Sequence, residues 1–272
     1  MNKKLTLATT DFDRVLLTSL AAAAIGLAAP AGAQEDDLEE QLFNPVARLV
    51  SVPFQFNLYR GEGAHQRDRY ELNLQPVVPL AATEHWSFIA RAVVPLESVP
   101  EVENGGRVKG IGDTTLQFFA APIEAGDFKW GLGPAVLAPT STNKRFGEGC
   151  WALGPTGVGL AEAADWTLGA LATQLWSVGS SDVNRLEVQP IVIYNFAGPW
   201  SAGYIGTIEA DWTVHGRDRW TVPIGLGASR LFRNDADWPI SLSFGAGVNA
   251  VRPTDAARWF LRLQVTFVFP ER

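Results

Sequence analysis

Cysteine, methionine and histidine are scarce in this sequence of 272 residues, and charged residues make up only 19% of it. The single cysteine, Cys150, excludes an internal disulfide and a cysteine-based zinc cluster. The three histidines (His65, His85 and His215) lack the short, regular spacing of metal-ligand pairs. The net charge of −7 argues against a nucleic-acid partner, because phosphate binding needs a basic patch. We therefore expect no catalytic, cofactor-binding or metal site.

Long apolar runs are missing beyond residue 34, so no further segment could form a membrane-spanning helix of ~18 residues. Residues 1–33 have the pattern of a secretory signal peptide: Lys3 and Lys4, an apolar run over 15–30, and small residues over 31–33. The sequence predicts export and cleavage near Ala33. An uncleaved membrane helix is the alternative, although the run is shorter than the ~20 residues needed to span a bilayer.

The segment that follows, residues 34–45, is strongly acidic. Such composition predicts a disordered periplasmic tail. The alternative is a partial plug that enters the interior of the folded domain and contacts Arg91 and Arg262. The remainder, residues 46–272, is expected to form one domain.

That domain shows alternation of apolar and polar residues with a period of two, which is typical of β-strands. In residues 258–269, Trp259, Leu263 and Phe267 share one face, while Arg262 and Gln264 share the other. The pattern predicts about twelve strands of about ten residues each, as transmembrane barrels use. We place them near 46–60, 69–79, 86–96, 110–121, 127–138, 151–160, 165–177, 185–196, 200–213, 219–232, 238–251 and 258–269.

The connections between these strands alternate in length. The segments 61–68, 97–109 and 139–150 are long, whereas the connections between them are short. Outer-membrane barrels alternate long outer loops with short periplasmic turns. The sequence therefore predicts an all-β fold, an up-and-down antiparallel transmembrane β-barrel preceded by a signal peptide.

Tryptophans mark the predicted strand ends. Aromatic girdles form at both membrane interfaces because the indole ring is apolar while its N–H seeks water. A β-sandwich core is the alternative, but a core would not sort tryptophans by strand end. The predicted girdle consists of Trp86, Trp130, Trp151, Trp166, Trp176, Trp200, Trp212, Trp220, Trp238 and Trp259.

Polar residues on the face opposite the apolar one are expected to line a water-filled lumen. Glu209 and Asp211 illustrate the reason, because a carboxylate that faced lipid would cost several kcal/mol. The lining is expected to be net negative and partly paired. Its predicted members are Asn57, Glu71, Asn73, Gln75, Arg91, Asp113, Gln117, Glu187, Gln189, Glu209, Asp211, Arg262 and Gln264.

Several segments, among them "NPVARLVSVPFQFN", "GIGDTTLQFFAAP", "WALGPTGVGL" and "QPIVIYNF", resemble a bacterial family of outer-membrane transporters. That family is similar to the proteins grouped as "meta-pathway of phenol degradation", whose members are often mislabelled neuromedin U. The resemblance covers nearly the whole chain after the signal peptide. It implies an outer-membrane β-barrel that passes small aromatic or apolar molecules, and it supplies no catalytic residues.

The sequence thus predicts a porin-like, non-enzymatic channel in the outer membrane of a Gram-negative bacterium, without energy coupling. Its expected partners are outer-membrane lipid, lipopolysaccharide, a small solute and, during biogenesis, the barrel assembly machinery. Two alternatives remain open. One is a lipase-like barrel enzyme that uses Ser141 or Ser180 with His65 or His215, and the other is a closed structural barrel.

Overall fold

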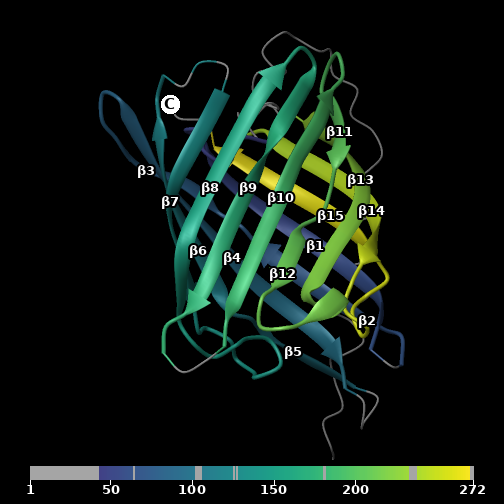
Figure 1. Cartoon of the computed structure of the whole chain (residues 1–272). Helices are drawn as coiled ribbons and strands as arrows, with labels where there is room; N and C mark the ends of the chain where they lie inside the picture. Colours follow the sequence, from purple (N-terminus) through teal and green to yellow (C-terminus); the bar gives the residue numbers. More distant parts are fainter. Residues whose placement is uncertain are drawn as a thin grey trace, which may run out of the picture. The chain divides into compact units, whose positions relative to one another are not determined.

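The computed structural model describes residues 43–63, 65–101, 106–124, 126, 128–179, 182–232 and 238–269. The predicted signal peptide, most of the acidic segment and the last three residues lie outside this part of the chain. The described residues form strands and one short 3-10 helix (Figure 1). Their bounds are β1 (Val50–Glu62), β2 (Arg67–Leu74), β3 (Val77–Ala82), β4 (Trp86–Pro100), β5 (Arg107–Ile111), β6 (Thr114–Pro122), β7 (Phe128–Ala138), β8 (Ala152–Ala163), β9 (Trp166–Ser177), β10 (Asn184–Asn195), β11 (Trp200–Tyr204), β12 (Ile208–Asp211), η1 (Gly216–Arg219), β13 (Trp220–Phe232), β14 (Ile240–Val251) and β15 (Trp259–Phe269).

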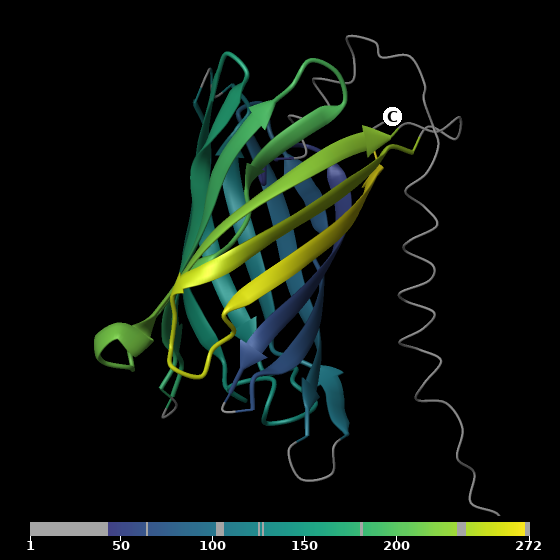
Figure 2. The same cartoon turned by 90° about the vertical axis from the view of Figure 1, so that its right-hand side faces the viewer.

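These strands close into one antiparallel barrel of 12 strands, which confirms the predicted fold class. Three barrel strands are each divided into two labelled pieces: β2 with β3, β5 with β6, and β11 with β12. Neighbours along the chain pair around the wall, β15 returns to β1, and the pairing of β9 with β10 completes the ring. Closure leaves no free sheet edge, a requirement for a sheet that spans lipid. Figure 2 shows the strands surrounding the interior.

The two ends of the barrel differ in their connections. The long-loop end carries residues 139–151 between β7 and β8, residues 212–219 between β12 and β13, and residues 252–258 between β14 and β15. The short-turn end carries connections such as 164–165 and 196–199. The predicted long loop 97–109 is partly strand, because the end of β4 pairs with β5 beyond the main wall.

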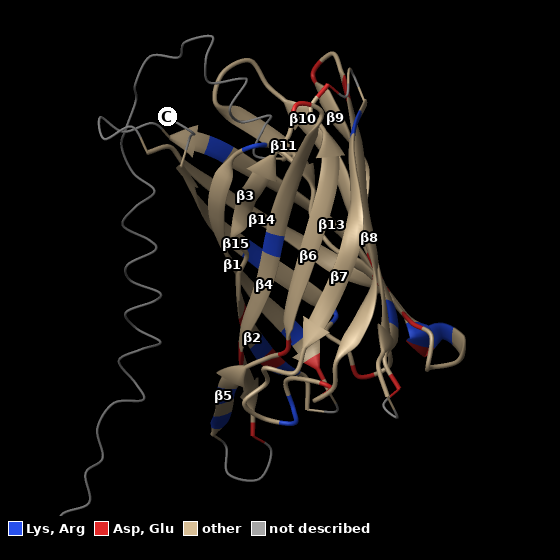
Figure 3. Ribbon diagram, turned by 90° about the vertical axis from the view of Figure 1, so that its left-hand side faces the viewer, with Lys and Arg blue, Asp and Glu red and all other residues tan. Residues whose placement is uncertain are grey.

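Side chains alternate between the two faces of the wall as the sequence pattern predicts. On β15, Phe260, Thr266 and Val268 are buried on the inner face, whereas Phe267 is exposed on the outer face. The outer face carries large exposed apolar side chains; Leu226 on β13, for example, has 68% of its surface exposed. Figure 3 shows that charged residues gather near the two ends and that most of the wall between them is uncharged, apart from a few Lys or Arg positions at mid-height. Such a band suits lipid and is unusual for a protein surface in water.

No helix in the described part of the chain has both the length and the apolar character to cross a membrane.

Candidate functional site: the barrel interior

The largest of three cavities inside the barrel lies toward the long-loop end and has a volume of about 610 Å³. Two smaller cavities, of about 240 and 150 Å³, adjoin it toward the short-turn end. Gln75, Arg91 and Gln189 line all three cavities, so they mark the place where the cavities meet. The largest cavity is lined by seven carboxylates (Glu62, Glu71, Glu97, Asp113, Glu148, Glu187, Glu209) and six cationic side chains (Arg69, Arg91, Lys144, Arg145, Arg185, Arg262).

Most of the predicted lumen residues border these cavities. Gln264 lines the two smaller ones. Asn57 is fully buried in the wall between Arg262 and Glu71, and it hydrogen-bonds to both. Asp211 lines none of the three cavities and instead accepts hydrogen bonds from the backbone N–H and the hydroxyl of Thr213. The predicted members that line the largest cavity are Glu71, Asn73, Gln75, Arg91, Asp113, Gln117, Glu187, Gln189, Glu209 and Arg262.

Ion pairs hold two of the interior arginines that the sequence analysis did not single out. Arg69 bonds to Glu71 at 2.7 Å and to Glu62 at 3.0 Å. Arg185 lies 2.9 Å from Glu187. Strand parity could have found both arginines, because each stands two residues before a predicted lumen glutamate. These pairs neutralise part of the charge in the interior.

Two apolar clusters lie on the inner faces of β4 to β9. Ile89, Phe119, Val158 and Leu171 form a buried cluster on the inner faces of β4, β6, β8 and β9. A second cluster on β7, β8 and β9, which includes Leu137 and Leu175, extends toward the long-loop end. The ion pairs with Glu62, Glu71 and Glu187 therefore lie on β1, β2 and β10, whereas β4 to β9 carry two apolar clusters separated by a row of buried polar side chains (Arg91, Gln117, Thr156 and Thr173). The sequence analysis expected a polar lumen throughout. Alternation alone cannot show this, because it separates inside from outside but not one interior wall from another.

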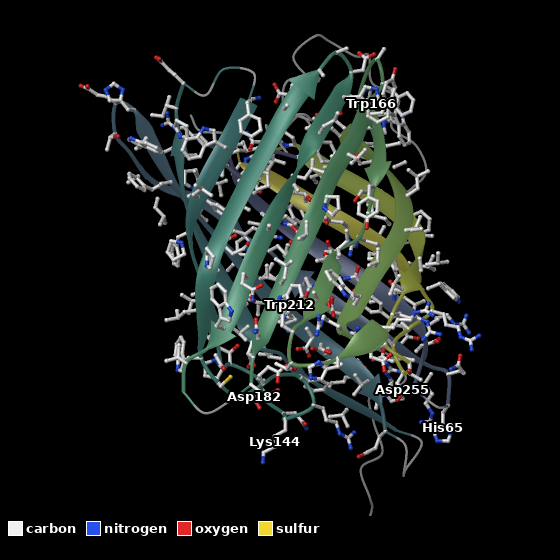
Figure 4. All side chains as sticks on the ribbon, in the orientation of Figure 1. His65, Lys144, Trp166, Asp182, Trp212 and Asp255 are labelled. Atoms are coloured by element: carbon white, nitrogen blue, oxygen red, sulfur yellow. The ribbon has the colours of Figure 1, made fainter. Side chains whose placement is uncertain are left out.

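The loop 139–151 folds inward at the long-loop end and is held by Asp113. The Asp113 side chain is 8% exposed and accepts backbone N–H bonds from Ser141 at 3.1 Å, Glu148 at 2.7 Å and Gly149 at 3.3 Å. Phe146, at the centre of this loop, is buried and lines the largest cavity. Asp113 therefore fixes the loop that narrows this end of the interior. Figure 4 shows Lys144 of this loop at the end opposite Trp166.

We expect Asp113→Ala to release this loop. Hydrogen bonds to a charged group contribute about 1.5–3 kcal/mol each, so losing several should raise the population of an open loop by about tenfold or more. Limited trypsin digestion should then cleave after Lys144 and Arg145 at least about tenfold faster in detergent. Asp113→Asn, which keeps one acceptor oxygen, should give an intermediate rate. Cleavage of Asp113→Ala at the wild-type rate would contradict this role.

The wall bends inward between β11 and β12. Gly206 has φ +149°, a conformation that favours glycine, and the backbone pairing with β10 is interrupted between residues 203 and 208. Ile205 lies over glycines of β13 and β14, where a Cβ on Gly245 would lie only 2.5 Å from the Ile205 side chain. The cavity of 240 Å³ lies beside this bend. The glycines of β13 and β14 thus make room for the Ile205 side chain inside the barrel.

A segment before the first strand occupies the short-turn end of the interior. Val46 packs into the apolar cluster with Ile89 and Phe119, and Leu49 is buried. Asn44 caps the turn, because its side chain accepts the backbone N–H of Val46 at 3.0 Å. Residues 43–49 therefore narrow the interior at its short-turn end. The acidic residues 34–42 lie outside the described part of the chain, so the predicted tail stays a prediction.

The predicted girdle tryptophans lie toward the two ends of the strands. Trp86 and Trp130 stack edge to face at the short-turn end, with ring centroids 5.9 Å apart. Trp212 and Trp220 make a similar contact of 5.6 Å at the long-loop end. Figure 4 labels Trp166 and Trp212, which lie toward different ends. Their role at a membrane interface stays a prediction.

The residues weighed for a lipase-like site do not form a hydrogen-bonded pair in the described part of the chain. The backbone N–H of Ser141 donates to Asp113, while His65 and His215 are exposed in other loops. Ser180 lies outside the described residues. The described residues contain no cluster of three or more His, Cys, Asp or Glu side chains that could hold a metal ion.

No family model matches the sequence, and no curated protein matches it. The structure is similar to an outer membrane channel from Pseudomonas putida F1, with 16% identity and a TM-score of 0.57 over 81% of this chain and 94% of that chain. It also resembles outer membrane phospholipase A from Escherichia coli, with 11% identity and a TM-score of 0.46; the match covers 81% of this chain and 90% of the phospholipase chain. A comparison with the toluene transporter TodX of P. putida gives 8% identity and a TM-score of 0.43; the match covers 82% of this chain and 90% of the TodX chain.

The fold of this chain therefore matches that of a β-barrel of the Gram-negative outer membrane. It shares its architecture with the P. putida channel along most of both chains.

Proposed function

We propose that this protein is a passive outer-membrane channel for small solutes that are partly apolar, such as aromatic compounds. The observation that carries this proposal is an interior in which the cavities meet both charged side chains and apolar clusters. An amphipathic solute can keep its polar group hydrated near the charged side chains while its apolar part contacts a cluster. The family resemblance in the sequence points to the same class of cargo.

The surroundings of the channel follow from this proposal. The chain would reach the outer membrane after cleavage near Ala33 and insertion by the barrel assembly machinery. Its exposed apolar band would contact lipid, and the tryptophans at each end of the barrel would form a girdle at each membrane interface. Lys144 and Arg145, on the inward-folded loop, are available to meet lipopolysaccharide phosphates or passing solutes.

The test is a conductance measurement on the purified chain in planar bilayers, together with liposome uptake of small aromatic and aliphatic solutes. We expect a small conductance and faster uptake of aromatic solutes than of aliphatic sugars of similar size. Ion selectivity should be weak, because seven carboxylates face six cations, and it should shrink at high salt as the Debye length shortens. Absence of both conductance and uptake would favour a closed barrel, and phospholipid hydrolysis would favour an enzyme.

A further inference from the structure

We propose that Arg91, Gln75 and Gln189 form a binding site for the carboxylate of a small apolar acid at the place where the three interior cavities meet. This proposal rests on the proposed channel function and names the chemical class of one solute. Arg91 is 9% exposed, and its side chain borders all three cavities. A carboxylic acid that moved along the interior would therefore pass this side chain.

Arg91 differs from the paired interior arginines in its partners. Arg69 and Arg185 each bond to glutamates, whereas Arg91 forms no ion pair with a carboxylate of the described residues. It donates instead to two neutral amide oxygens, Gln117 Oε1 at 2.6 Å and Gln75 Oε1 at 2.7 Å. Glu187 acts on this cation only from beyond ion-pair distance, so Arg91 lacks the direct counter-charge that buried cations ordinarily have. An anionic ligand would supply that charge.

The neighbouring amides leave donors available for the same ligand. Gln75 uses its carbonyl oxygen for Arg91, and Gln189 makes no side-chain hydrogen bond to another described residue. Both side chains line the same cavities as Arg91. The remaining N–H groups of the guanidinium add donors in a planar fork, which matches the geometry of a carboxylate. The donor set therefore favours a carboxylate over a neutral alcohol.

The guanidinium is held in place by a chain of hydrogen bonds across the wall. Gln117 accepts from Arg91 and donates through Nε2 to Thr173 Oγ1 at 2.7 Å. Thr173 in turn lies 2.8 Å from Thr156. These contacts fix the direction of the Arg91 fork before a ligand arrives, which lowers the entropy lost on binding.

An apolar surface adjoins this donor set. Leu171, which is buried in the apolar cluster, lines both larger cavities, and Ile191 lines the cavity of 240 Å³. A ligand whose carboxylate meets Arg91 can therefore place a ring or short chain against Leu171. The site thus fits a small aromatic or cyclic monocarboxylate, for which benzoate is the probe.

The test measures benzoate binding to the full chain in detergent by isothermal titration calorimetry, so it does not depend on conductance. Benzyl alcohol, with the same ring and no charge, should bind at least about tenfold more weakly. Arg91→Gln should weaken benzoate binding by about tenfold or more, and Gln189→Leu, which leaves the Arg91 hydrogen bonds intact, should weaken it severalfold. The matched control is Arg60→Gln, which removes an arginine that is paired with Asp68 at 3.0 Å and lines none of the three cavities, so benzoate affinity should be unchanged.

Three results would overturn the site. These are no benzoate binding by the wild type, equal binding of benzoate and benzyl alcohol, or equal losses of affinity in Arg91→Gln and Arg60→Gln. If Arg91→Gln fails to fold, Gln189→Leu and Arg91→Lys carry the test, since lysine keeps the charge and loses the planar fork. A wild type that conducts small solutes but does not bind benzoate would refute this site and leave the channel standing. Benzoate binding without conductance would refute the channel and keep the site.

Discussion

Leu263→Arg is expected to lower the free energy of unfolding in lipid vesicles by about 2–4 kcal/mol, the cost of a lipid-facing arginine near the membrane midplane. Leu263 lies near the middle of β15, and its cross-strand neighbours are Phe56 and Phe244. Phe244 is 59% exposed on the outer face. A charge placed here would face hydrocarbon without a partner. Urea-induced unfolding in vesicles, followed by tryptophan fluorescence, measures the change.

The matched control is Gln264→Arg, one residue further along the same strand. Gln264 lies opposite Gln55 and Ser243 and lines the two smaller interior cavities. An arginine at this position can reach water inside the barrel, so this variant should unfold within about 1 kcal/mol of the wild type. Equal destabilisation by the two substitutions would show that lipid does not contact the outer face.

Exchange of residues 43–48 for glycine and serine, at unchanged length, should raise the single-channel conductance at least about twofold, because the narrowest part of a pore limits conduction. Val46 is the side chain that fixes this segment inside the apolar cluster with Ile89 and Phe119. Without it, the segment should leave the short-turn end of the interior. Recordings in planar bilayers at high salt, where charge effects are screened, isolate the steric effect.

The control exchanges residues 215–217, which lie in an exposed connection at the other end of the barrel, for glycine and serine. This change should leave conductance as in the wild type. An unchanged conductance in the 43–48 variant would mean that the segment does not obstruct the path of ions. If circular dichroism shows that this variant does not fold, the segment is needed for the stability of the barrel and its effect on conductance is not the reason for the change.

Strand prediction succeeded because one physical constraint acts along the whole chain. Each of the 12 barrel strands overlaps the range that alternation predicted, including those that the structure divides, such as 200–213. The first strand begins at Val50 and not at residue 46, because Val46 packs into the interior cluster. The divisions themselves were not predicted. The bend at Gly206 depends on Ile205 meeting glycines of β13 and β14, which lie about twenty or more residues further along the chain.

The candidate site was predicted in part. Parity placed Arg91, Gln75 and Gln189 on the inner face, and all three line the cavities. It gave no means of telling Arg91, which bonds to neutral amides, from Arg185, which pairs with Glu187. Partners across neighbouring strands depend on the register of pairing and on side-chain direction.

The sequence by itself determined the all-β architecture, the two faces of each strand and the positions of tryptophans near strand ends. It could do so because backbone geometry sends successive side chains to opposite faces, and burial against lipid or the interior selects residues by that period. Only the tertiary structure decided where the apolar clusters lie inside the barrel and that Asp113 draws residues 139–151 inward. It also decided that Val46 occupies the short-turn end. These features depend on contacts between residues far apart in the chain, which closure of the barrel brings together.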